Sequence, residues 1–249
     1  MVLLKTPEEI KIMAEGGKIL AKVIKELAKQ VKPGVSTIAL NRAAEALILK
    51  YGCQCSFLGH EGYPACLCAS VNEEIVHAIP SERTLKEGDI ISLDLGLIYK
   101  GFHSDMAVTV AVGKISPQCK KLIKATEESL KKGIKAIKPG KDFKDISSAI
   151  QKHIEGRGFG VVKNLCGHGI GRELHEDPQI LNYVEKGEPA LTIEEGMVLC
   201  LEPMAALGSG RIKRGKGGYA YETADGSWAA HFEHTIAVTK RGAKILTVI

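Results

Sequence analysis

The chain has 249 residues, of which 45% are hydrophobic and 25% are charged, as in ordinary globular proteins that bury a large core. A net charge of +5 permits weak contact with polyanions such as ribosomal RNA but does not indicate sequence-specific nucleic-acid binding. The apolar run at the N-terminus is too short for a signal peptide and no segment is long enough to span a membrane, so we expect a cytoplasmic protein without a membrane partner.

Four helices in two pairs are predicted from the helical spacing of apolar residues and from the residues at their ends. The first begins at Thr6, with Pro7 in its first turn and Glu9 completing a capping box, and it stops at residues 32–34. The other helices are expected at about residues 36–51, 116–138 and 143–155. In both pairs the helices end near a glycine, which indicates that one helix-pair arrangement occurs twice in the chain.

The seven cysteines are an odd number in a chain without a recognisable secretion signal, so we expect reduced thiols rather than a disulfide framework. Two Cys-x-Cys pairs, at residues 53–55 and 66–68, offer a structural zinc site as an alternative, because four thiolates can close a tetrahedron. We favour reduced thiols because neither pair has the commoner two-residue gap, and a Cys-x-Cys within a strand usually forms one buried face.

Two strands are predicted at residues 90–98 and 102–110, joined by a turn at residues 99–101. Strand alternation places Asp94 and Asp105 on the same side of this hairpin, as direct or diagonal neighbours. Two adjacent carboxylates repel each other unless a proton or a cation lies between them, so the pair indicates a metal site. The alternative is a pair of solvated carboxylates on an exposed face.

The two helix pairs are separated by a constant offset. Gly34 and Gly140 lie 106 residues apart, and Gly52 and Gly158, at the ends of the second helices, share that offset. Two unrelated helix pairs would have little reason to share it. We therefore expect a single domain, residues 1–249, with an internal repeat at roughly 6–113 and 116–242.

The second repeat supplies two further acids in matching positions. Glu202 follows a Glu-Gly pair at the same distance as Asp94 does, and the residues around Glu233 echo those around Asp105. If the repeats pack about a pseudo-two-fold axis, all four carboxylates meet at the centre and form a two-metal site.

Each repeat also carries a histidine ahead of its acids, and the residues alone do not choose between His77 and His168 as a ligand. Four carboxylates with one or two imidazoles form a hard, oxygen-rich site. Manganese, iron or cobalt would suit it about as readily as zinc.

The segment from residue 207 to residue 227 is rich in glycine and carries the basic residues Arg211, Lys213, Arg214 and Lys216. We expect a solvated, flexible loop here. Contact with a polyanion or with the ribosome is the alternative.

Five motifs make the sequence resemble the type I methionine aminopeptidases, within the wider creatinase and aminopeptidase group. They are NEEIVHAIP at 72–80, GFHSD at 101–105, CGHGIGRELHEDP at 166–178, LEPM at 201–204 and EHT at 233–235. The gap of 34 residues between His168 and Glu202 leaves no room for the type II insertion, and we expect no additional N-terminal domain of the prolidase kind. The resemblance implies an α+β "pita-bread" fold: a curved antiparallel sheet with two helix pairs on its outer face and pseudo-two-fold symmetry.

The resemblance also implies a role for each motif residue. Two divalent ions, cobalt, manganese, iron or zinc, would be held by Asp94, Asp105, His168, Glu202 and Glu233, with Asp105 and Glu233 bridging. The catalytic groups would be Glu202, as a proton carrier, His175, facing the developing oxyanion, and His77, also facing the substrate. The methionine pocket would include Tyr63, Cys68, Leu174 and Trp228. The family's commoner bacterial pattern has Phe in place of Leu174 and Tyr-His in place of His60-Glu61, so the pocket rim differs here.

The activity implied is removal of the initiator methionine from nascent polypeptide N-termini when the second residue is small, by a monomeric enzyme. One alternative is a proline-specific peptidase on the same scaffold. The other is a binding protein that has kept the scaffold without catalysis. We favour catalysis because every metal-site position holds a competent ligand.

Overall fold

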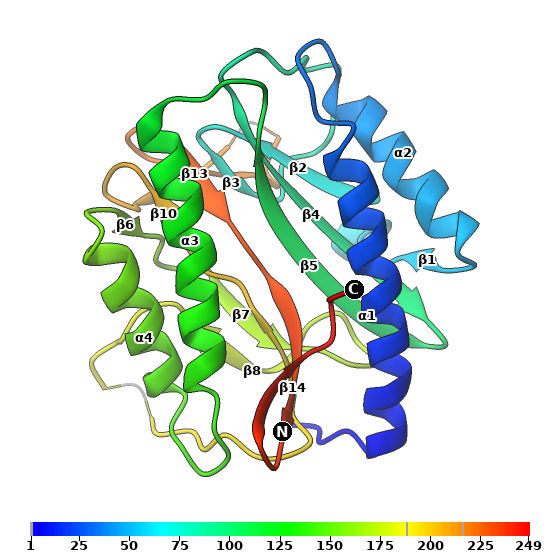
Figure 1. Cartoon of the computed structure of the whole chain (residues 1–249), viewed down its shortest axis with the longest axis vertical. Coiled ribbons are helices and arrows are strands. Elements are labelled where there is room, and N and C mark those ends of the chain that lie inside the picture. Colours follow the sequence, from blue (N-terminus) through cyan, green and yellow to red (C-terminus); the bar gives the residue numbers. More distant parts are fainter. Residues whose placement is uncertain (1, 188, 216) are drawn as a thin grey trace.

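The computed structural model describes residues 2–187, 189–215 and 217–249. In those ranges, four α-helices form two pairs that cover the same, outer face of an antiparallel β-structure (Figure 1). The helices are α1 (Pro7–Ala28), α2 (Thr37–Lys50), α3 (Pro117–Ala136) and α4 (Lys144–Glu155), and a short 3-10 helix, η1, spans His60–Gly62. None of these helices is long and apolar enough to cross a membrane.

The first three helices begin directly after a residue whose side chain caps them. Thr6 Oγ1 accepts a hydrogen bond from the Glu9 amide at 3.2 Å, and Glu9 Oε2 accepts one from the Thr6 amide at 3.0 Å. Ser36 and Ser116 are the N-caps of α2 and α3. The four predicted helices are confirmed, although α1 ends at Ala28, before the predicted stop at residue 32.

Four antiparallel strands form the sheet of the first half, in the order β1, β4, β2, with β5 also paired to β4. They are β1 (Gln54–Cys55), β2 (Leu67–Val71), β4 (Ile90–Tyr99) and β5 (Phe102–Ala111). Leu93, Leu95 and Leu97 alternate along β4 and belong to the buried core shared with α1 and α2. Each such side chain contributes roughly 1.5–3 kcal/mol of burial energy. This face therefore holds the register of β4 and turns Asp94 to the opposite side.

Five antiparallel strands form the sheet of the second half, in the order β15, β14, β9, β7, β8. They are β7 (Cys166–Gly169), β8 (Glu176–Leu181), β9 (Val198–Leu201), β14 (His234–Thr239) and β15 (Gly242–Ile245). This sheet joins the first at β5, where the Glu233 amide donates to the Ala107 carbonyl at 2.9 Å. The Thr235 hydroxyl accepts from the Asp105 amide at 2.9 Å. These bonds bring the acids of the two halves into one region.

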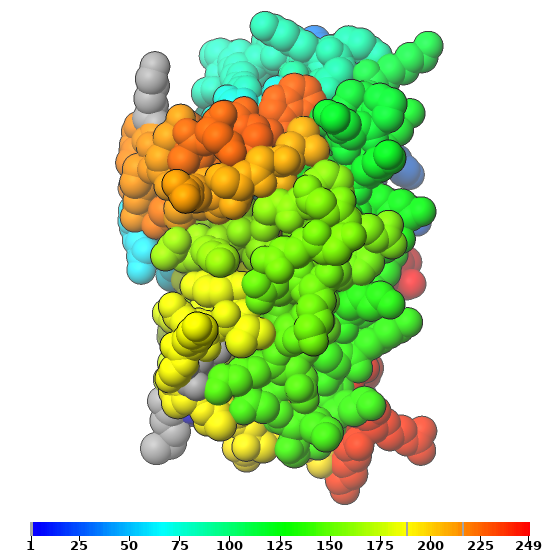
Figure 2. All heavy atoms as spheres, turned by 90° about the vertical axis from the view of Figure 1, so that its left-hand side faces the viewer, coloured from blue at the N-terminus to red at the C-terminus, as the bar shows by residue number. Residues whose placement is uncertain are grey.

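The segment 207–227 is not the flexible loop that its composition predicts. Two short strands within it, β11 (Ile212–Arg214) and β12 (Tyr221–Thr223), form a hairpin that pairs with β3 (Glu74–Val76). Ile212 and Tyr221 pack against a small buried apolar cluster, which supplies the driving force for this order. Figure 2 shows the segment (orange) packed against the body of the molecule. Lys216 lies outside the described residues.

The remaining small sheet joins distant parts of the second half. It contains β13 (Ala229–His231), β10 (Met204–Ala206) and β6 (Gly160–Val161), in that order. β9 ends one residue before Glu202 and β10 begins two residues after it, so the pairing of these two strands fixes the chain on both sides of Glu202.

We propose that residues 6–113 and 116–242 are structural repeats within one domain, residues 1–249. Matching contacts support this proposal. The Gly34 amide donates a hydrogen bond to the Leu85 carbonyl at 2.9 Å, and the Gly140 amide donates one to the Ile193 carbonyl at 2.8 Å. Both glycines have a positive φ, of 89° and 82°, which a glycine adopts at little cost.

A disulfide links Cys55 to Cys66, so the expectation that all thiols are reduced is wrong for this pair. The cause is tertiary: β1 and β2 both pair with β4, with Cys55 opposite Leu97 and Leu67 opposite Leu95, so their facing ends come together. Cys53 and Cys68 are buried and unlinked. The four-cysteine zinc site is also ruled out, since two of its thiolates are consumed by the disulfide.

Candidate active site

The hairpin of β4 and β5 places its two acids diagonally, as its alternation predicts. Asp94 lies opposite Ala107, and Asp105 lies opposite Gly96. The turn consists of Lys100 and Gly101, both with positive φ, as in two-residue hairpin turns of type I′. Asp94 is 6% exposed and Asp105 is 4% exposed. The alternative of two solvated carboxylates is therefore wrong.

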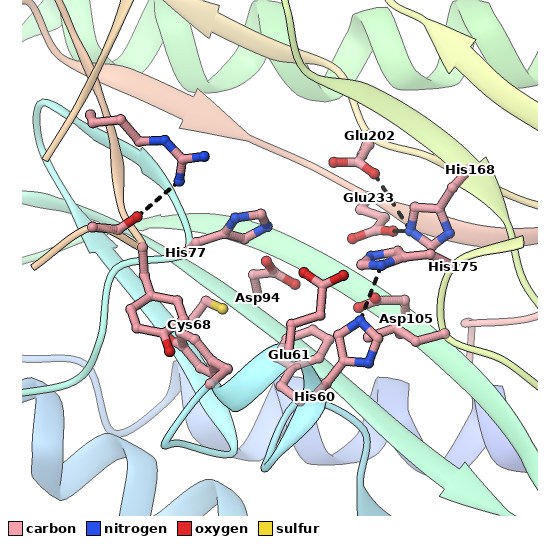
Figure 3. A pocket seen from close by; sticks show the side chains of 16 residues that line it. His60, Glu61, Cys68, His77, Asp94, Asp105, His168, His175, Glu202 and Glu233 are labelled. Atoms are coloured by element: carbon pink, nitrogen blue, oxygen red, sulfur yellow. Dashed lines mark hydrogen bonds and ion pairs between the residues drawn. The ribbon is translucent and has the colours of Figure 1, made fainter.

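His168, on β7, faces two acids of the second half (Figure 3). Its Nε2 lies 3.6 Å from Glu202 Oε1 and 3.9 Å from Glu233 Oε1. Its Nδ1 lies 2.8 Å from the Gly169 carbonyl, which can only accept, so Nδ1 carries the proton. The lone pair of Nε2 is therefore directed at the carboxylates, which is the tautomer that a metal-ligating histidine requires.

Ligand atoms converge in two overlapping groups. Oxygens of Asp94, Asp105 and Glu233 lie within 4.8 Å of one another, and a second group within the same limit joins Glu233 to His168 and Cys200. Among the described residues, Asp94 Oδ1 and Glu233 Oε1 are buried without a hydrogen-bond partner. Burying a carboxylate oxygen without a hydrogen-bond donor costs free energy unless a cation binds it. These residues therefore fit a divalent metal.

Burial and the repulsion between neighbouring carboxylates raise the pKa values of the four acids. Burial, and then the charge of neighbouring acids, raises the pKa of Asp94, Glu202 and Glu233 well above the usual range. Burial raises the pKa of Asp105 to about 7, against a hydrogen bond from the Met106 amide that favours its ionised form. Four crowded acids that retain protons near neutrality are ready to exchange them for cations.

A cavity of about 260 Å³ opens beside these groups. One end presents carboxylates and imidazoles, and the other end is aromatic and apolar. The lining residues are Phe57, His60, Glu61, Tyr63, Cys68, His77, Asp94, Asp105, His168, Leu174, His175, Glu202, Arg214, Gly218, Tyr219 and Glu233.

Comparison with known proteins places this site in a family. Residues 11–240 match metallopeptidase family M24. The chain belongs to this family. It is 48% identical to methionine aminopeptidase 1 of Bacillus subtilis, over 99% of each chain.

Solved structures agree with that assignment. The methionine aminopeptidase of Thermotoga maritima superimposes with a TM-score of 0.97 at 42% identity, with all of both chains covered. The predicted pita-bread fold is thereby confirmed. The Xaa-Pro dipeptidase of Bacillus anthracis has a TM-score of 0.78 at 27% identity, and only 62% of that chain is covered. The proline-specific alternative is therefore not favoured.

Most of the pocket residues that the M24 resemblance predicts lie in the cavity. Tyr63, Cys68 and Leu174 are buried along its apolar end, and burial raises the pKa of the Cys68 thiol, which keeps it neutral. Trp228 is an exception. It is not among the lining residues, and its partly buried side chain packs against the core beneath α3 and α4. A role for Trp228 in the methionine pocket therefore stays a prediction.

The choice between the two motif histidines is decided by their surroundings. His77 lines the cavity, but no group of convergent ligand atoms among the described residues includes it. Its ring lies edge-on to Tyr221 at 6.0 Å, and burial lowers its pKa to about 4. A neutral imidazole in this place faces the cavity rather than the carboxylates.

Three residues of this site have no role assigned to them from the sequence. Tyr219 donates to the Gly62 carbonyl at 3.0 Å and packs edge-on to Tyr63 at 5.6 Å, which links the 207–227 segment to the pocket wall. His231 is buried, with Nε2 3.8 Å from Glu202 Oε2. Cys200 lies 3.6 Å from the Thr235 hydroxyl, and burial raises its pKa, so it is a neutral thiol. Cys200 and His231 each lie two residues before an acid of the repeat, Glu202 and Glu233, and this spacing is a signal that could have found them.

Proposed function

We propose that this chain is a metal-dependent aminopeptidase that removes the N-terminal methionine from nascent proteins and peptides when the second residue is small. The observation that carries the proposal is the buried cluster of acids and one imidazole beside an apolar cavity, in a chain similar over its full length to methionine aminopeptidases. The cavity volume of about 260 Å³ suits one flexible apolar side chain next to the reactive groups.

We propose Asp94, Asp105, His168, Glu202 and Glu233 as the ligands of two divalent ions. The unpartnered oxygens of Asp94 and Glu233 and the free lone pair of His168 support this set. The resemblance to methionine aminopeptidases implies that Asp105 and Glu233 would serve both ions, and Glu233 does belong to both convergent groups. Bound ions of this kind polarise a carbonyl and lower the pKa of water. Manganese, cobalt, iron and zinc all suit these donors.

Glu202 is proposed to move the proton. Its side chain is 14% exposed, whereas that of Glu233 is 3% exposed. Glu202 lines both the cavity and a second, neighbouring groove, which His77, His168 and His175 also line. A carboxyl group in that position can take a proton from the attacking water and deliver it to the leaving amine.

His175 is proposed to stabilise the tetrahedral oxyanion. It lines both hollows, beside His77 and His168, where an extended substrate would present its first carbonyl. Partial desolvation, and then the neighbouring His60 imidazole, lowers the pKa of His175. The ring is therefore neutral near pH 7 and offers one N–H donor, whose interaction strengthens as negative charge develops.

The substrates in the cell are proposed to be the N-termini of new chains, met by a monomer in the cytoplasm, where such chains carry initiator methionine. A weak contact with the ribosome through the basic segment 207–227 belongs to the same proposal. Lys213 of that segment is half exposed and lies 3.6 Å from Glu222.

The test is methionine release from short peptides by protein that has been stripped of metal and then reloaded. We expect rapid turnover of Met-Ala-Ser, little of Met-Lys-Ser because the second side chain would meet the crowded metal site, and none of Ala-Pro peptides. Comparable turnover of the two methionyl peptides would refute the specificity. Preference for Ala-Pro would favour a proline peptidase, and failure on all peptides would favour a binding protein.

A further inference from the structure

We propose that His60 is a positioning residue for His175: it donates a hydrogen bond to Nδ1 of His175 and so holds the proton of that imidazole on Nε2, the nitrogen that serves the substrate. This inference rests on the proposed function, because it assigns a partner to the group that stabilises the oxyanion. His60 stands where the family's commoner bacterial pattern has tyrosine.

The geometry links three imidazoles in a row (Figure 3). His60 Nε2 lies 3.3 Å from His175 Nδ1, and the two rings meet edge-on with centroids 5.1 Å apart. The other side of His175 meets His168 edge-on at 4.6 Å. His175 is thus held between a pocket-rim histidine and a proposed metal ligand, and its Nδ1 is engaged by His60.

The chemistry of two facing imidazole nitrogens decides what this contact does. One nitrogen must donate and the other must accept, because two N–H groups or two lone pairs cannot form a hydrogen bond with each other. When His60 donates, His175 accepts at Nδ1 and carries its only proton on Nε2. Without a donor at Nδ1, both tautomers of His175 are populated, and a fraction of the molecules offers no N–H to the substrate carbonyl.

The loop that carries His60 is built to hold it in place. The Gly59 amide donates to the Tyr63 carbonyl at 2.8 Å, and the Tyr63 amide donates to the His60 carbonyl at 2.8 Å. Gly59 and Glu61, on either side of His60, have φ values of 84° and 47°, which bend the backbone sharply around it. The disulfide closes the loop at residues 55 and 66. His60 is therefore presented by a constrained turn rather than by a free loop.

The experiment compares His60→Phe, which keeps a ring without a donor, with His60→Gln, whose amide nitrogen can reach the place of Nε2. For Met-Ala-Ser we expect kcat of His60→Phe to fall roughly 10-fold or more, as is usual when a histidine loses its orienting partner, with KM and metal content nearly unchanged. His60→Gln should regain most of kcat. His153→Phe, the same change on α4 where the His153 side chain is 13% exposed and contacts Glu128 of α3 outside the cavity, is the matched control, and its kcat should match that of the wild type.

Two further measurements distinguish a His60 that positions the proton of His175 from a His60 that only shapes the pocket wall. In a His175→Ala background, His60→Phe should cost nothing more, since the two residues act as a unit. Nitrogen NMR of the zinc-loaded protein should show His175 protonated at Nε2 in the wild type and a tautomer mixture in His60→Phe, a readout that does not depend on turnover.

Several outcomes would overturn the inference. These are a rise in KM with unchanged kcat in His60→Phe, His60→Gln no better than His60→Phe, additive losses in the double variant, or an Nδ1-protonated His175 in the wild type. A wild-type protein that releases no methionine but shows the Nε2 tautomer would instead contradict the proposed function while supporting the contact.

Discussion

At the scale of single residues, the surroundings of each side chain decide its role more than its type does. His168 and His175 lie seven residues apart on one glycine-rich segment, and their rings touch. Yet His168 points its lone pair at two carboxylates, whereas His175 opens to the cavity beside them. We therefore propose different roles for these two imidazoles in contact, metal binding for His168 and a contact with the substrate for His175.

Substituting these two histidines should produce different defects. We expect His175→Ala to lower kcat by about 10²–10³ with KM and metal content nearly unchanged, because an oxyanion donor acts mainly in the transition state. His168→Ala should instead lose bound metal. Steady-state kinetics combined with elemental analysis checks both. A metal-depleted His175→Ala together with a fully loaded His168→Ala would reverse the assignments.

At the scale of elements, the disulfide and the strands beside it hold the pocket wall. The loop between β1 and β2 contributes Phe57, His60, Glu61 and Tyr63 to the cavity. Its ends are linked by the disulfide across 11 residues. The link restricts the unfolded chain and also keeps these four side chains facing the site.

Removing the disulfide should therefore destabilise the fold. We expect Cys55→Ser to lower the free energy of unfolding by about 2–3 kcal/mol, as loop-closure entropy predicts for a loop of this size. Urea unfolding of oxidised protein measures the change. Thiol reduction of the wild type should reproduce the loss and should have no further effect on Cys55→Ser. Identical unfolding of oxidised and reduced wild type would contradict the prediction.

At the scale of the whole molecule, the two halves each supply part of one site, and the seam between them runs through β5. The Thr235 hydroxyl accepts from the Asp105 amide and also donates to the Asp105 carbonyl at 2.8 Å. Two residues before Thr235, the backbone amide of Glu233 donates a hydrogen bond to the Ala107 carbonyl of β5. The ligand positions are therefore held by strands and apolar cores that do not themselves require metal.

Metal removal should accordingly abolish activity without unfolding the protein. We expect the chelated protein to keep its far-ultraviolet circular dichroism, to melt at a lower temperature, and to recover activity with divalent manganese, cobalt or iron. Binding at 100 times the dissociation constant stabilises the folded state by about 2.7 kcal/mol, so the melting shift should follow metal concentration. Full activity in protein shown by elemental analysis to be metal-free would contradict this expectation.

The sequence alone was sufficient for features that depend on neighbouring residues. The capping box at Thr6 and Glu9 marks the start of α1, because both hydrogen bonds close within one turn. The alternation around Asp94 and Asp105 predicts their shared face, since a two-residue turn keeps the parity of the strands. The family motifs predict the fold and the five proposed ligands.

Only the tertiary structure decided features that join distant residues. It linked Cys55 to Cys66 because two separate strands meet along β4. It ordered the described part of the 207–227 segment by adding β12 to β3, and it packed the partly buried Trp228 against the core beneath α3 and α4. Such contacts depend on which apolar faces pack together across the fold. The spacing of residues within a short stretch of sequence does not determine that packing.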